Sequence, residues 1–168
     1  TSISGTFDRR DGVADLDTYQ ELRMAMDSVG FAGHEQEGIF RVTAALLHAS
    51  NLQFENRGSD DSCVYDGDGT LAAVSDLLGV SVNSLQTALT SSVIEARGEV
   101  LMKRLSTTQA KKALEAVTKA IYGVLFEYIV KRINQSIEVN GDADEYELNK
   151  VATIGVLDIF GFESFQTN

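Results

Sequence analysis

The chain has 168 residues, 43% of them apolar, which is enough for one domain with a hydrophobic core. The 25 acidic and 14 basic residues give a net charge of −11, which disfavours broad binding to nucleic acid or to an anionic membrane. The single cysteine excludes an intrachain disulfide and favours a reducing, intracellular setting. No apolar run approaches the ~20 residues of a membrane-spanning helix, so we expect no membrane insertion.

The two ends suggest a piece of a longer protein. The sequence begins at Thr1 without an initiator Met, and it stops at Asn168 directly after a strongly apolar stretch. We therefore expect an internal segment.

Two amphipathic helices are predicted in the first third of the chain. Within residues 15–30, apolar side chains recur at helical spacing, Asp17 and Gln20 are placed as a capping box, and Gly30 is placed as a stop. Residues 35–50 repeat the pattern with a broader apolar face, which predicts a well-buried helix.

The middle of the chain is more varied. Residues 53–70 are rich in Gly, Asp and Ser, which predicts a loop with room for one short strand. Two shorter helices are predicted at 71–78 and 84–89. Residues 94–105 have strand-compatible flanks around a glycine, which predicts an exposed hairpin-like loop.

A long helix and a buried strand are predicted after this loop. Ser106 and Gln109 have the spacing of a capping box, and the apolar periodicity that follows could extend for some 30 residues, to about Arg132. A polar turn comes next, and residues 152–157 then form a short apolar run of the buried-strand type. The predicted fold class is therefore mainly α with a few strands.

The most informative motif is the end of that strand, where Asp158 is followed three residues later by Gly161. In P-loop nucleotidases an Asp at a strand end can approach the Mg²⁺ shell, usually through water. A Gly has no Cβ, so its N–H can approach a γ-phosphate oxygen closely and its backbone can move when the phosphate leaves. The pattern alone is short, and an ordinary strand end with a capping Asp explains it equally well.

Other patterns in the sequence give weaker evidence for a functional site. Residues 66–69 hint at a calcium loop, but Leu71 and Leu77 occupy the positions where such a loop needs Gly and Glu. His34 and His48 are too far apart for helical metal spacing. The sequence has no phosphate-binding G-x-x-x-x-G-K-[ST] loop, so this chain is not expected to hydrolyse ATP by itself.

From Gly155 to Phe165 the sequence G-V-L-D-I-F-G-F-E-S-F resembles the switch II signature of myosins. The upstream segments M-D-S-V-G, I-F-R-V followed by A-L-L-H, K-A-I-Y and R-I-N occur in the order that the myosin head has them. The resemblance covers nearly the whole chain. It implies part of the P-loop NTPase α/β motor fold, with a helical upper 50-kDa region at 1–150, a core strand and switch II at 151–163, and the start of the relay helix at 164–168.

The resemblance also implies roles for individual residues. Asp158 would lie in the water-mediated shell of Mg²⁺, Gly161 would donate its N–H to the γ-phosphate, and Glu163 would pair with an arginine outside this chain to close the pocket. The loop near 95–106 resembles the cardiomyopathy loop, an actin-contacting element. Glu99 would occupy its acidic or phosphorylatable position, and Lys103 and Arg104 would supply its basic contacts.

The implied function is that of a segment of an actin-activated Mg-ATPase motor. Its cofactors would be ATP and Mg²⁺, and its partners the actin filament and the rest of the myosin heavy chain, in a cytoplasmic, cytoskeletal setting. The alternative is a non-catalytic helical interaction module in which Asp158 and Gly161 only terminate a core strand.

Overall fold

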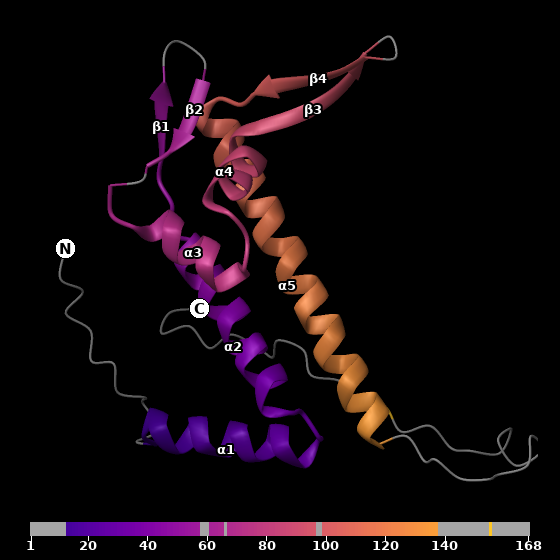
Figure 1. Ribbon diagram of the computed structural model, residues 1–168. Coiled ribbons are helices and arrows are strands. Elements are labelled where there is room, and N and C mark those ends of the chain that lie inside the picture. Colours follow the sequence, from indigo (N-terminus) through magenta and orange to yellow (C-terminus); the bar gives the residue numbers. More distant parts are fainter. Residues whose placement is uncertain (1–12, 58–60, 66, 97–98, 138–154, 156–168) are drawn as a thin grey trace, which may run out of the picture. The chain divides into compact units, whose positions relative to one another are not determined.

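The computed structural model describes residues 13–57, 61–65, 67–96, 99–137 and 155. The chain divides into two compact units, 1–137 and 138–168, and every described helix and strand belongs to the first (Figure 1). These elements confirm the mainly helical fold class. In chain order they are α1 (Asp15–Ser28), α2 (Gly33–Ala49), β1 (Phe54–Arg57), β2 (Asp61–Val64), α3 (Thr70–Leu78), α4 (Val82–Thr90), β3 (Ser91–Ala96), β4 (Glu99–Arg104) and α5 (Thr107–Ile137).

The first two helices lie where the apolar periodicity predicts them, but the cap predicted for α1 is wrong. The helix begins at Asp15 after Ala14, which has no side-chain oxygen to accept a cap hydrogen bond. Asp17 therefore lies within the first turn, where its negative charge complements the helix dipole. The stop at Gly30 is confirmed, because this residue adopts the left-handed conformation with φ of 84°.

The prediction for residues 53–70 is also wrong, because two strands form there instead of one at most. Strands β1 and β2 pair antiparallel, with Phe54 opposite Val64 and Arg57 opposite Asp61. Val64 is buried and Phe54 is partly buried, so one end of the hairpin is held by the core. The polar composition hid the strands, since their pairing and packing, more than their intrinsic propensity, stabilise them.

The larger hydrophobic core, here called the first core, lies between the β1–β2 hairpin and helices α2 to α5. Leu71 and Leu89 are completely buried within it, and each such side chain contributes on the order of 1.5–3 kcal/mol relative to exposure. Leu114 and Val117 bring the N-terminal half of α5 against it. Its buried members are Ala49, Leu52, Val64, Leu71, Val74, Leu85 and Leu89.

The second core is smaller and lies where α1 turns into α2. It consists of Met26, Phe31 and Ile39, with Leu125 and Ile129 of α5 packed against them. Gln36 is fully buried beside it, and its amide nitrogen donates to Asp27 Oδ1 at 2.7 Å and to the carbonyl of Phe31 at 2.9 Å. These two hydrogen bonds tie the end of α1 to the start of α2.

Helix α5 follows the predicted pattern closely. Its capping box is present: Ser106 N–H donates to Gln109 Oε1 at 3.0 Å, and Gln109 N–H donates to Ser106 Oγ at 3.4 Å. Its 31 residues give a length of about 46 Å. Its N-terminal half packs on the first core and its C-terminal half on the second, so α5 spans both.

None of the described helices combines the length and apolarity that crossing a bilayer requires.

Candidate functional site

The predicted hairpin-like loop is a regular two-stranded hairpin. Strands β3 and β4 pair antiparallel over six residues each, from Ser91 opposite Arg104 to Ala96 opposite Glu99. Figure 1 shows the hairpin projecting from the N-terminal end of α5. Among the described residues no third strand pairs with it, so both of its outer edges are open.

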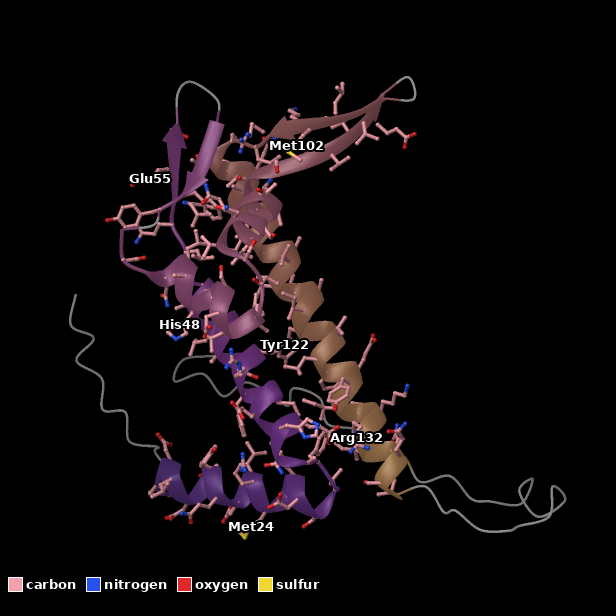
Figure 2. The ribbon with its side chains drawn as sticks, viewed as in Figure 1. Met24, His48, Glu55, Met102, Tyr122 and Arg132 are labelled. Atoms are coloured by element: carbon pink, nitrogen blue, oxygen red, sulfur yellow. The ribbon has the colours of Figure 1, made fainter. Side chains whose placement is uncertain are left out.

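The hairpin exposes apolar side chains on both faces. Val93 lies opposite Met102, and these side chains are 67% and 64% exposed. The next pair is Ile94 and Leu101, which points to the other face and is also exposed. Figure 2 shows Met102 on this arm, near its base. Contiguous exposed apolar residues of this kind mark surfaces that contact other proteins.

The basic residues predicted to act here lie at the base of the hairpin. Lys103 pairs with Ser92 and Arg104 with Ser91, and both basic side chains are exposed. The base is closed by a hydrogen bond from Leu105 N–H to the carbonyl of Thr90, at 2.9 Å. Lys103 and Arg104 therefore lie at the base of the apolar arm, on opposite faces of β4 and next to the start of α5.

The remaining candidate residues are described partly or not at all. Glu99 is the first residue of β4, but its side chain is outside the described set. Asp158, Gly161 and Glu163 lie outside the described residues, as does the predicted strand that precedes them. Within the described part of the chain, no group of three or more His, Cys, Asp or Glu side chains could hold a metal ion.

A polar cluster at the other end of α5 was not predicted. Glu35, in the first turn of α2, accepts hydrogen bonds from Tyr128 Oη at 2.6 Å, from Ala32 N–H at 2.8 Å and from an Arg132 terminal nitrogen at 3.2 Å. The same guanidinium donates to the carbonyl of Gly30 at 3.1 Å. We call Glu35, Tyr128 and Arg132 the α5 anchor; Figure 2 labels Arg132 near the C-terminal end of that helix.

The anchor combines charge with aromatic contacts. Arg132 Nε lies 3.2 Å from Glu35 Oε1 but is not aligned for a hydrogen bond, so this contact is an ion pair only. The guanidinium carbon lies 5.4 Å from the centre of the Phe31 ring, within the range of a cation–π contact. The Phe31 and Tyr128 rings meet edge to face at 6.4 Å. The anchor therefore joins α5 to the turn between α1 and α2.

The hydrogen bonds of the anchor stabilise the ionised form of Glu35. The Tyr128 hydroxyl contributes most, followed by Ala32 N–H and the Arg132 guanidinium, and together they lower the pKa of Glu35 to about 2. The same contact raises the pKa of Tyr128, because a neighbouring carboxylate opposes loss of its proton. At neutral pH the cluster holds one carboxylate, one neutral phenol and one guanidinium.

One signal for the anchor was available in the sequence. Tyr128 and Arg132 are four residues apart, so they share a face of α5, and the periodicity placed Arg132 on the apolar face. A cation on such a face needs a partner. The identity of that partner was hidden, because Glu35 is 97 residues away in the sequence.

We predict an acid-dependent loss of stability that Glu35→Gln removes in part. Because the folded pKa is lowered from 4.5 to about 2, the contribution of Glu35 is complete above pH 4.5 and is lost as pH falls through 2. Urea unfolding of the 168-residue chain across this range measures it. The midpoint should fall less steeply with acid in the variant than in the wild type, and parallel curves would contradict the prediction.

Comparison with known proteins agrees with the resemblance found in the sequence. The family model described as the myosin head, or motor domain, matches residues 3–168. Myosin-14 and Myosin-11 of Arabidopsis thaliana are 40% and 41% identical to the chain over 92% and 94% of it, and Unconventional myosin ID of Drosophila melanogaster is 39% identical over 89%.

The chain spans only 10% of the length of the two plant relatives and 14% of the fly protein. A match over nearly all of this chain is nevertheless sufficient to assign its family. The chain belongs to the myosin head (motor domain) family and is a segment of a myosin motor domain.

Proposed function

We propose that this chain is the part of an actin-based, ATP-driven motor that links a filament contact to the sensing of the γ-phosphate. Residues 1–150 would form much of the upper 50-kDa region, 151–163 a core strand with switch II, and 164–168 the start of the relay helix. ATP, Mg²⁺, the actin filament and the rest of the heavy chain are the proposed ligands and partners, in the cytoplasm. The family match over residues 3–168 carries the proposal.

At the nucleotide end, Asp158 would supply a carboxylate, the oxygen ligand that Mg²⁺ prefers, and would hold the metal through water. When bound, Mg²⁺ supplies positive charge that offsets the charge of the phosphates. Gly161 would present its N–H to the γ-phosphate, and Glu163 would pair with an arginine from elsewhere in the motor. Both ATP and Mg²⁺ need residues beyond this chain, because the sequence lacks the phosphate-binding loop.

At the actin end, the β3–β4 hairpin supplies the contact. Its exposed apolar side chains offer area for burial, and Lys103 and Arg104 add positive charge in a chain of net charge −11. A basic site at the base of the arm would attract an acidic partner surface and fix its orientation. Glu99, where β4 begins, supplies a permanent negative charge at the acidic or phosphorylatable position of this loop.

The test is the steady-state Mg-ATPase of the complete motor domain that contains this chain, measured with increasing filamentous actin. The proposal predicts a slow basal rate that rises to a plateau with actin. ATPase activity that is absent at every actin concentration would favour a helical interaction module instead.

A further inference from the structure

The two ends of α5 are held in different ways. At its N-terminal end, α5 packs on the first core, whose members include the fully buried Leu71 and Leu89. At its C-terminal end, α5 packs on the second core, which among the described residues has three buried side chains, Met26, Phe31 and Ile39. Apolar packing therefore holds the hairpin end of the helix more firmly than the other end.

Two open apolar grooves border the second half of α5. One, of about 450 Å³, is lined by Val42 of α2 and by α5 residues that include Leu125 and Tyr128. The other, of about 370 Å³, lies among α1, α2 and α5 and is lined by residues that include Phe31 and Ile133. A helix end beside such spaces has room to tilt unless directed contacts prevent it.

The α5 anchor supplies those directed contacts. The side chains of Arg132 and Glu35 are only 29% and 20% exposed, so solvent screens their interaction less than that of a surface pair. Arg132 also reaches the carbonyl of Gly30, in the turn that ends α1. One guanidinium thus joins α5 to the turn after α1 and to α2, beside the smaller of the two cores formed by the described residues.

We propose that Arg132, held by Glu35 and Tyr128, is a positioning residue that makes α5 a stiff strut between the actin-contacting hairpin and the segment that follows the helix. Arg132 lies roughly 40 Å along the helix from the hairpin base. With the anchor intact, force applied to the hairpin moves the helix as one body. Without the anchor, the C-terminal end of α5 tilts, and this tilting absorbs the displacement of the hairpin. This inference rests on the proposed motor function.

The test compares Arg132→Ala with Lys131→Ala in the complete motor domain. Both substitutions remove one cation from neighbouring positions of α5, but Lys131 is exposed. We expect Arg132→Ala to lower the actin-activated kcat at least about fivefold, the lower end of typical coupling between sites. The KM for actin and the basal ATPase should stay close to wild type, since neither the hairpin nor the nucleotide residues are changed. Lys131→Ala should match wild type throughout.

Milder variants keep the test informative if Arg132→Ala folds poorly. Tyr128→Phe removes only the hydroxyl that donates to Glu35, and Arg132→Lys keeps the charge but loses the planar fork. Each of these two variants should lower the actin-activated kcat less than Arg132→Ala does. Glu35→Gln combined with Arg132→Ala should be no worse than Arg132→Ala alone, because both substitutions break the same contact.

Three results would overturn the inference. Arg132 variants that match Lys131→Ala would show that the anchor does not affect coupling. A parallel fall in basal and actin-activated rates would assign the anchor to general stability. A wild-type motor without actin activation would overturn the proposed function and this inference together.

Discussion

Replacing Gly161 with Ala in the complete motor domain is expected to leave ATP binding largely intact and to reduce hydrolysis by about 100-fold or more, the size of effect seen when one preorganised hydrogen-bond donor is lost. The added Cβ would intrude where the backbone N–H must approach the γ-phosphate. Rapid mixing of the motor with ATP, followed by acid quench, measures the hydrolysis step directly.

Gly33→Ala is the matched control for this prediction. It makes the same change at the first residue of α2, outside the proposed switch II segment, at an exposed position where an added Cβ meets no atom within 4 Å. It should hydrolyse ATP at the wild-type rate. If Gly161→Ala also hydrolysed ATP normally, the proposed hydrogen bond to the phosphate would be wrong.

Reversing the two charges at the base of the hairpin, Lys103→Glu with Arg104→Glu, is expected to raise the KM for actin with little change in kcat. Both side chains are exposed at the base of the apolar arm, and the substitution would replace the proposed attraction to an acidic partner surface by repulsion. The defect should be largest at low salt and should shrink as salt screens exposed charges. Actin cosedimentation at several ionic strengths measures this loss of actin affinity and its dependence on salt.

The chain offers a second pair of adjacent lysines as a control. Lys111 and Lys112 are exposed near the start of α5, so reversing both changes the net charge by the same amount without altering the hairpin. This control should bind actin almost normally. Equal weakening by the two reversals would mean that net charge, and not the hairpin, controls binding.

The two proposed defects distinguish the roles of the two ends of α5. Hairpin reversal should affect the KM for actin, whereas loss of Arg132 should affect the actin-activated kcat. The distinction follows from the geometry, because one substitution changes the contact surface and the other leaves that surface intact.

The parts of the fold that could be predicted from the sequence are those determined by local spacing. The apolar periodicity located α2 and α5, and the Ser106–Gln109 spacing located the start of α5. The hairpin at 94–105 was also predictable, although β3 begins earlier, at Ser91. These features depend on residues that are close together in the chain.

The features that the sequence analysis predicted wrongly or did not predict have physical causes. The Asp17–Gln20 spacing fits a capping box with Asp17 as the N-cap, but the N-cap of α1 is Ala14, three residues earlier, and it has no side-chain cap. The β1–β2 hairpin depends on pairing and on burial of Val64, which a Gly- and Asp-rich sequence does not reveal. The α5 anchor joins Glu35 to Arg132, and no local pattern specifies a contact over such a separation.

For the candidate site, sequence resemblance and structure contribute different parts. The resemblance alone assigns roles to Asp158, Gly161 and Glu163, and these remain predictions. The structure adds the open edges and exposed apolar faces of the β3–β4 hairpin, which spacing alone did not predict.

The most direct test of the central claim is whether ATP releases the complete motor domain from actin. The motor should cosediment with filaments in the absence of nucleotide and should dissociate on addition of MgATP, because we propose that the filament contact and the phosphate sensor belong to one coupled unit. Binding that is the same with and without MgATP, or no binding in either condition, would contradict the account.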